Sequence, residues 1–325
     1  MITSKTIKEF AKKTGADVVG IGSMDRFEGA PKQYDPRYIM PEAKSIIGLG
    51  FRIHRGLLRG IEEGTFFAAY PSMGYANIND VYAPIVLREL GNFLEDDGYE
   101  AFLFQNTSVR LGTGAGKPVS PDKPKPDVFM HFRIAAVICG MGEIGYSNLL
   151  LSPQFGPRQR LAFIITDAEL EPDPIYDGSS ICDSCMLCVK ECPAGAISEE
   201  ETVKVTIAGK DFTFGKLNEL KCSAVYQAGA PMYSPFISDE VAEVISNIIE
   251  DEKDQEKINS YKGDIWSYLR ENVPYIKRSS ESYHHPAAIC GARGCMRACM
   301  IHLEEEKKIE NTFRKPFRRR EPWRL

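Results

Sequence analysis

The chain has 325 residues, of which 43% are hydrophobic, so it can bury a sizeable core and, on length alone, form about two domains. Its formal net charge of −5 argues against a general affinity for nucleic acids. No apolar run is long enough to span a membrane, and the first residues show neither a signal-peptide core nor a twin arginine. We therefore expect a cytoplasmic protein without a membrane span.

The N-terminal half of the chain is predicted to alternate helices with short apolar strands. Thr3 or Ser4 is suited to cap the first helix, and Gly15 is suited to end it. Residues 23–43 contain prolines and other turn-forming residues and predict a loop. The expected elements, in chain order, are a helix over 3–14, strands over 17–22 and 44–50, a helix over 79–94, and strands over 101–104 and 160–166.

Two glycine-rich segments look like nucleotide-binding motifs, and both fail on inspection. Residues 112–118 are similar to a P-loop, but Leu111 stands where a glycine is needed and Pro118 where a magnesium-binding hydroxyl is needed. The glycines of 140–145 fit the dinucleotide pattern G-x-G-x-x-G. Pro153 follows too soon for the long helix of that fold. We interpret the first segment as part of a flexible loop near an active site.

The main motif is the run Cys182-x2-Cys185-x2-Cys188-x3-Cys192-Pro193. This is the spacing of bacterial ferredoxins, in which three thiolates bind one [4Fe–4S] cluster and the fourth binds a second cluster. Zinc usually takes two separated pairs of ligands, and a disulfide framework needs an oxidising compartment, so both alternatives are weaker. The run therefore predicts an iron–sulfur protein.

Two clusters need eight cysteines, and four further ones complete that number. Cys222 stands alone, whereas Cys290, Cys295 and Cys299 lie near the C-terminus. By the crossing rule of two-cluster ferredoxins, Cys299 should join the first three cysteines of the run in cluster 1. Cys192 should then join Cys222, Cys290 and Cys295 in cluster 2. A single cluster, with the later cysteines unliganded, is the alternative.

The rest of the chain adds four smaller features. Residues 203–214 alternate around a turn and predict a β-hairpin. Residues 239–272 are helical in pattern, and their charged run at 250–257 is interpreted as a solvated face. The basic, aromatic segment 314–324 predicts a solvated tail or an arm across a partner subunit rather than a nucleic-acid-binding segment. Cys139, inside an apolar run, is expected to be a buried structural thiol.

Four stretches resemble the epoxyqueuosine reductase and reductive dehalogenase superfamily. They are IKEFAKKTGADVVGIGS near the N-terminus, PEAKSIIGLGF, the glycine-rich CGMGEIGYSNLLLSPQFGPRQRLAFIITDAELEPD, and the cysteine run with its later partners. The glycine-rich stretch is the most specific of the four and is closer to the dehalogenase-like branch.

The resemblance implies an α/β (α+β) fold, in which a nitroreductase-like cobalamin-binding core joins a two-cluster bacterial ferredoxin-like module. The implied corrinoid and substrate core is 1–175, and the ferredoxin-like module is 176–302, with a helical insertion at about 223–289. A basic C-terminal tail follows at 303–325.

The resemblance also implies cofactors and site residues. Two [4Fe–4S] clusters would accompany a base-off cobalamin, and the backbone of Gly140, Gly142, Glu143 and Gly145 would approach the corrin ring. The implied catalytic residues are a tyrosine that donates a proton and a charged neighbour that assists it. The candidates for these roles are Tyr82, Tyr146, Asp127 and His131.

These catalytic candidates depart from the family pattern. Tyr146 stands where relatives carry Lys or Arg, and Asp127 lies close to the position of the reductases' catalytic acid without the surrounding motif. A packing role for Tyr82 and a satisfied core histidine at His131 are the structural alternatives.

We therefore predict a cobalamin-dependent reductase of the reductive-dehalogenase-like class that acts on a small molecule. Its partner would be a low-potential electron donor of the ferredoxin or flavodoxin type, and a homodimer is a further expectation. The alternatives are an iron–sulfur electron-transfer protein without cobalamin, a reductase or activator of a corrinoid protein, and an epoxyqueuosine reductase-like enzyme of tRNA modification. The insertion between Cys222 and Cys290 argues against the last.

Overall fold

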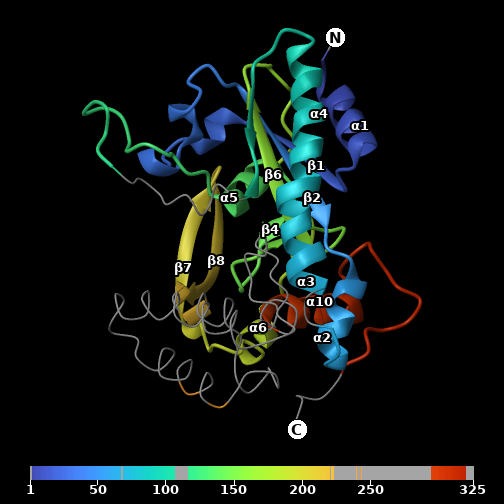
Figure 1. Cartoon of the computed structure of the whole chain (residues 1–325). Helices are drawn as coiled ribbons and strands as arrows, with labels where there is room; N and C mark the ends of the chain where they lie inside the picture. The colour runs from blue at the N-terminus through green and yellow to red at the C-terminus, as the bar shows by residue number, and fades with distance from the viewer. Residues whose placement is uncertain are drawn as a thin grey trace.

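A computed structural model gives the fold of most of the chain. It describes residues 2–66, 69–106, 116–219, 221–222, 239, 243 and 294–319. Within these ranges a four-stranded sheet is covered by helices on both faces, and a two-stranded hairpin and a cysteine-bearing helix lie below it in Figure 1. No helix among the described residues is long and apolar enough to cross a membrane.

The helices and strands follow the chain in the order that Figure 1 colours. The helices are α1 (Ser4–Thr14), α2 (Arg59–Glu63), α3 (Ala69–Pro71), α4 (Ala83–Glu95), α5 (Phe132–Ile138), α6 (Leu187–Lys190) and α10 (Cys295–Glu305). The strands are β1 (Val18–Ser23), β2 (Ser45–Arg52), β3 (Ala101–Phe104), β4 (Glu143–Ile144), β5 (Leu150–Leu151), β6 (Gln159–Thr166), β7 (Ile197–Ile207) and β8 (Lys210–Leu217).

The central sheet has the strand order β1-β2-β6-β3, and every neighbouring pair is antiparallel. Its register places Ile47 beside both Ile21 and Ile164. Because successive side chains of a strand point to opposite faces, Ile164 and Phe163 lie in different hydrophobic clusters. Both faces of this sheet are therefore buried. The predicted strands are confirmed to within two residues at their ends.

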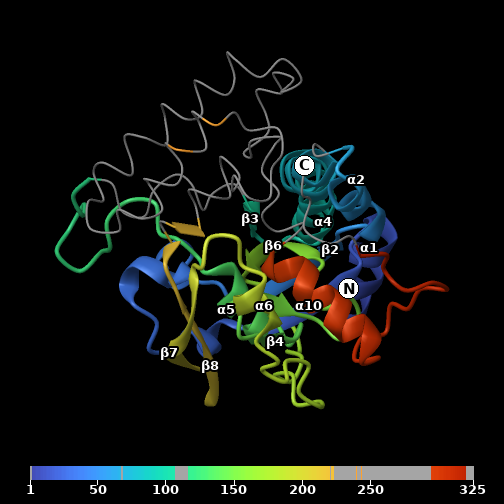
Figure 2. The ribbon, with the colours of Figure 1, turned by 90° about the horizontal axis from the view of Figure 1, so that it is seen from below.

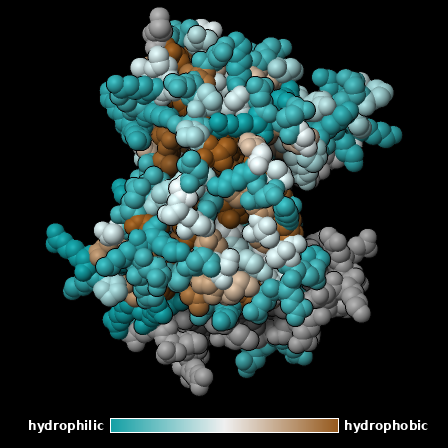
Figure 3. Space-filling model, turned by 180° about the vertical axis from the view of Figure 1, so that it is seen from behind, coloured by the Kyte–Doolittle hydropathy of each residue, from teal (hydrophilic) through white to brown (hydrophobic). Residues whose placement is uncertain are grey.

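The two hydrophobic clusters form the layers on either side of the sheet. Helices α1 and α4 cover one face, where Ile7 and Leu90 are fully buried. Helix α5 and the β7–β8 hairpin cover the other, where Val137 and Phe214 are buried. Most of the back of the molecule is polar, but apolar side chains show in a hollow across its middle (Figure 3).

Local sequence explains the main element boundaries. Thr3 caps α1 in a reciprocal capping box with Thr6, and Gly15 ends the helix, as predicted. The hairpin is longer than the predicted 203–214 and turns at Ala208 and Gly209, both of which have positive φ. The predicted helix over 79–94 begins later, at Ala83, because π-helical turns at Ser72–Ala76 and Ile78–Tyr82 precede it.

Three further predictions concern the glycine segment, two segments that are mostly undescribed, and the fold type of the core. Helix α5 precedes the glycines of 140–145, where a dinucleotide-binding fold would have a strand, which agrees with the rejection of that fold. Most of the predicted helical segment 239–272 and most of the P-loop-like segment 112–118 lie outside the described residues. The nitroreductase-like character of the core stays a prediction.

Helix α10 and Phe317 attach the C-terminal region to the core. Helix α10 crosses the predicted boundary at 302, and its Met300 lies in the same cluster as Ile47. Phe317 is 6% exposed in that cluster, and the Arg55 guanidinium stacks on the ring of Phe313 at 3.7 Å. Phe317 thus packs against its own chain, whereas Arg314, Lys315, Arg318 and Arg319 are exposed, as expected for a solvated segment. An arm across a partner subunit stays a prediction.

Candidate iron–sulfur site

The loop that carries the cysteine run is shaped by unusual backbone angles. Ser184 and Met186 have positive φ, which few non-glycine residues adopt, and each flanks Cys185. Cys188 is buried on α6, whereas Cys182 and Cys185 are partly exposed. The loop therefore curls so that its thiols face one region instead of alternating along an extended strand.

Helix α10 brings two distant cysteines to this loop. Cys295 and Cys299 are four residues apart and so lie on one face of the helix. Helix α6 packs beside α10, as Figures 1 and 2 both show. The thiol of Cys299 lies within electrostatic reach of those of Cys182, Cys188 and Cys185, and more weakly of that of Cys295.

The thiol of Cys295 lies within electrostatic reach of those of Cys222 and Cys192, and more weakly of Cys188. The two cysteines of α10 thus differ in the thiols that neighbour them most strongly, and each also lies within electrostatic reach of one thiol of the other predicted group. Cys290 lies outside the described residues, and which thiolate binds which cluster stays a prediction. None of the eight described cysteines forms a disulfide.

Burial makes these thiols poor anions on their own. It raises the pKa of Cys188 to about 11 and that of Cys295 to about 12, and it raises the pKa of Cys299 well above its ordinary value. Neighbouring thiols add to each shift. A bound cation reverses this preference, because it holds its sulfur ligands as thiolates. Convergent, buried thiols without disulfides fit iron–sulfur clusters.

Backbone N–H groups point at two of the sulfurs. Tyr146 N donates to Cys182 Sγ and Ala196 N donates to Cys192 Sγ, both at 3.3 Å. Hydrogen bonds of this kind tune the reduction potential of a cluster, since they stabilise negative charge on its sulfur ligands. The first comes from the glycine-rich segment, which therefore lies against the cysteine loop.

The glycines assigned to a corrin ring contact their own chain. A Cβ on Gly140 would lie 2.3 Å from the carbonyl oxygen of Pro174, and one on Gly142 would lie 2.0 Å from that of Leu151. A Cβ on Gly145 would meet the Leu151 side chain at 2.7 Å. These glycines are therefore needed for close backbone packing. They do not form an open cradle, and their contact with a corrin ring gains no support.

Glu143, which was also assigned to the corrin ring, forms hydrogen bonds with the backbone of the cysteine loop. It is 9% exposed, and its Oε1 accepts from Ile181 N at 2.8 Å and from Cys182 N at 2.7 Å. The Ser180 hydroxyl lies 3.2 Å from the same oxygen. The role of this carboxylate is therefore to bind the backbone that enters the cluster loop.

The two candidate tyrosines have their hydroxyl groups occupied in different places. The Tyr146 hydroxyl lies 3.1 Å from the Ser198 carbonyl and 3.2 Å from that of Glu199, so it donates to the hairpin. Burial raises its pKa, and the neighbouring Cys188 thiol adds to the shift. The Tyr82 hydroxyl donates to the carbonyl of Gly15 at 3.1 Å, at the end of α1. The packing alternative for Tyr82 agrees with this contact.

Asp127 and His131 precede α5 and differ in environment. Asp127 is exposed at positive φ, beside a cleft of about 610 Å³ at the β3 edge that Phe102 and Phe129 line. His131 caps α5 by accepting from Ile134 N, and burial lowers its pKa to about 4. The four catalytic candidates do not form one hydrogen-bonded group within the described residues, and their catalytic roles stay predictions.

Two arginines near the second cysteine group were missed by the sequence reasoning. Burial lowers the pKa of Arg133, while the nearby thiols of Cys295 and Cys222 oppose that shift. Arg160 lies close to it, stacks on Tyr75 at 3.9 Å and bonds to Asn79. Arg133 lies before the glycine-rich stretch and Arg160 lies within it, and nothing in this spacing indicates that the two are close in the fold.

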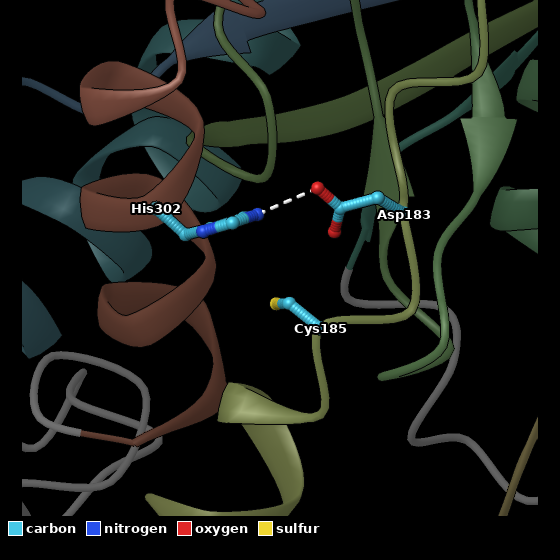
Figure 4. A group of neighbouring side chains, drawn as sticks. All are labelled: Asp183, Cys185 and His302. Carbon is cyan, nitrogen blue, oxygen red and sulfur yellow. Dashed lines mark hydrogen bonds and ion pairs between the residues drawn. The ribbon is translucent and has the colours of Figure 1, made fainter.

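A cluster of polar side chains lies beside the cysteines of the predicted cluster 1 (Figure 4). Asp183 Oδ2 lies 2.8 Å from His302 Nε2 and 2.8 Å from Lys308 Nζ, with Cys185 next to them. Burial alone would raise the pKa of Asp183, but the hydrogen bonds from Lys308 and His302 hold it well below its usual range. This group links the cysteine loop to α10 and to the segment after it.

The sequence comparisons agree with the cysteine geometry. The model of the 4Fe-4S binding domain matches residues 177–198. A tetrachloroethene reductive dehalogenase of Desulfitobacterium hafniense is 44% identical over 72 residues, which cover 22% of this chain and 13% of that protein. The epoxyqueuosine reductase of Bacillus subtilis is 25% identical over 217 residues, which cover 58% of this chain and 50% of that protein.

One solved structure shares the fold. The catabolic reductive dehalogenase NpRdhA, solved with 3-bromo-4-hydroxybenzoic acid, aligns with a TM-score of 0.51 and 19% identity, covering 82% of this chain and 36% of its own. The chain thus spans half or less of the length of these three relatives. Epoxyqueuosine reductases and reductive dehalogenases are therefore homologues of this chain, which carries a 4Fe-4S binding domain within a mixed α+β fold.

Proposed function

We propose that the chain is an iron–sulfur reductase that takes electrons from a low-potential donor of the ferredoxin or flavodoxin type and delivers them to a small-molecule substrate. The observation that carries the proposal is the convergence of cysteines from the loop 182–192, from Cys222 and from α10 into two neighbouring groups. Two adjacent groups suit a two-cluster electron path better than a zinc site.

The proposed ligands follow from that grouping. Cys182, Cys185, Cys188 and Cys299 would hold cluster 1, and Cys192, Cys222, Cys290 and Cys295 would hold cluster 2. Each bound cluster supplies one-electron redox chemistry. The chain's own part is to bury the thiols, to donate N–H groups to the Cys182 and Cys192 sulfurs, and to keep the two groups adjacent through α6 and α10.

The electron acceptor would lie beside the cysteines of the predicted cluster 2. Arg133, whose pKa responds to the thiols of Cys295 and Cys222, and the nearby Arg160 put positive charge beside this group, so an anionic acceptor would be attracted there. A cobalamin acceptor, as the resemblance implies, is part of the proposal. The glycines first assigned to it contact their own chain.

Anaerobic purification tests the reductase proposal. The chain should carry about eight iron atoms, show the broad iron–sulfur absorption, and be reduced by dithionite and reoxidised without loss of iron. Stoichiometric zinc in place of iron would overturn it. Uptake of added cobalamin, with a corrin absorption spectrum, tests the acceptor, and iron-loaded protein without corrinoid affinity would favour the electron-transfer alternative.

An epoxyqueuosine reductase-like activity is the second candidate. Its support is the length of the match, since an epoxyqueuosine reductase of Leadbetterella byssophila is 26% identical over 61% of this chain and 65% of that protein. The dehalogenase matches are shorter. Conversion of epoxyqueuosine in RNA by the iron-loaded, reduced chain would favour this activity, and turnover of aryl or vinyl halides alone would exclude it.

A further inference from the structure

The carboxylate of Glu143 is buried beside the first cysteine of the run. It belongs to β4, whose backbone is fixed by pairing Glu143 with Leu151 in β5. It is almost fully buried, and its Oε1 accepts from two consecutive N–H groups, those of Ile181 and Cys182. Both distances are short for N–H to oxygen bonds, as expected when the acceptor is charged.

These two N–H groups depend on the carboxylate. The segment of Ile181 and Cys182 is neither helix nor strand, so its N–H groups have no partner in regular secondary structure. Ile181 is 2% exposed and packs with Leu151 and Leu303. If the acceptor is removed, the buried N–H donor has no partner, and the folded state loses stability equal to the full desolvation penalty of that group.

The same short segment holds the sulfur of Cys182. Three residues after Glu143, Tyr146 N donates to Cys182 Sγ. A Cβ on Gly145 would come within 3.7 Å of that sulfur, so the chain passes close beside it. Residues 143–146 therefore form hydrogen bonds with both the backbone and the side chain of the first cysteine of the run.

We propose that Glu143 is a positioning residue for cluster 1. It fixes the Cys182 backbone so that the sulfur meets the Tyr146 N–H and the other thiols of its group. The inference rests on the proposed function, because it assigns this role toward a cluster that the chain would bind. It gives the glycine-rich segment a second purpose: this segment supports the metal centre from the core side.

The test compares Glu143→Ala and Glu143→Gln with Glu169→Ala. Glu169 is the control because its side chain is 84% exposed and pairs only loosely with Lys44, at 3.4 Å. Three measurements are made on each full-length chain. They are iron per chain, the midpoint potentials from redox titrations followed by electron paramagnetic resonance, and hydrogen exchange of the Ile181 and Cys182 amides in the iron-free protein.

Glu143→Ala should lose about half of the iron and the spectroscopic signal of one cluster, or shift that cluster to a lower potential, because the N–H bond to Cys182 Sγ is lost. The two amides should exchange about tenfold faster or more. Glu143→Gln keeps an amide oxygen that can accept, so it should restore the iron and show intermediate exchange. Glu169→Ala should match the wild type.

The outcomes separate the two proposals. Wild-type iron, potentials and exchange rates in Glu143→Ala overturn the role of Glu143 and leave the reductase proposal standing. A wild-type chain that binds no iron overturns the reductase proposal, and the role of Glu143 falls with it. If Glu143→Ala does not fold, Glu143→Gln carries the test, and unchanged amide exchange in that variant overturns the inference.

Discussion

Arg297, which lies between the two cysteines of α10, forms a bidentate ion pair with Glu62 of α2. Nε lies 2.7 Å from Oε2 and the second guanidinium nitrogen lies 3.0 Å from Oε1. Arg297 is 5% exposed and Glu62 is fully buried. A planar, paired contact fixes orientation as well as distance, so it sets the rotation of α10 and the directions in which Cys295 and Cys299 point.

Arg297→Met should destabilise the chain by about 3–5 kcal/mol, because it leaves the Glu62 carboxylate buried without its guanidinium. The double variant Glu62→Leu with Arg297→Met should recover much of this loss, since two apolar groups need no ionic partner. Unfolding in denaturant measures both.

Arg318→Met is the matched control for this pair. Arg318 pairs with Glu63, the neighbour of Glu62, but its side chain is 61% exposed and the distance is 3.5 Å. Its loss should cost less than about 1 kcal/mol. Equal effects of Arg297→Met and Arg318→Met would contradict a special role for the buried pair.

The cluster assignment can be tested with single cysteine variants. Cys299→Ala should remove or perturb cluster 1 and leave the signal of cluster 2, whereas Cys295→Ala should do the reverse, because each thiol neighbours a different group. Paramagnetic resonance of the reduced protein, with iron analysis, distinguishes the two variants.

The control is Cys139→Ala. This variant should keep all the iron, since Cys139 is fully buried and its thiol lies 3.7 Å from the Ile46 carbonyl. Damage by Cys299→Ala confined to cluster 2 would refute the crossing.

The predictable part of this site was the part encoded by local spacing. Cysteines three residues apart, such as Cys182, Cys185 and Cys188, must share a region, and Cys295 and Cys299 must share a helix face, so a grouping of the cysteines could be predicted from the sequence alone. Periodicity likewise located the strands, because burial on both faces leaves continuous apolar runs such as that in β6.

The contacts that hold the site were not predictable in this way. Glu143 and Ile181, like Glu62 and Arg297, lie far apart in the sequence, and no local pattern records such partners. The packing of the glycines was not predictable for a related reason. A motif indicates that a Cβ is excluded, but only the fold shows that a Cβ on Gly142 would meet the Leu151 carbonyl oxygen.

Gly142→Ala should therefore destabilise the chain even when no cofactor is present. Its φ of +150° disfavours a side chain, and the new Cβ would lie 2.0 Å from the Leu151 oxygen, which is backbone and cannot rotate away. We expect a loss of at least about 2 kcal/mol, from strain and displaced backbone, in the unfolding of iron-free protein. Gly56→Ala is the control, because nothing lies within 4 Å of its Cβ and its φ is ordinary. A stable Gly142→Ala chain that had lost only cobalamin affinity would instead support a corrinoid contact.

His131 should make the stability of the chain depend on pH. Burial, and then the charge of Arg133, lowers its pKa to about 4, below the ordinary value of 6.5. Between these two values the unfolded chain binds more protons than the folded one, so the contribution of His131 is complete above about pH 6.5 and is lost as the pH falls toward 4. From pH 7 to pH 5 the loss should be about 2 kcal/mol. His131→Asn keeps an N-cap acceptor for Ile134 N but does not titrate, so its free energy of unfolding should fall less over this range. Parallel curves for the two proteins would show that His131 is free to take up its proton in the folded state.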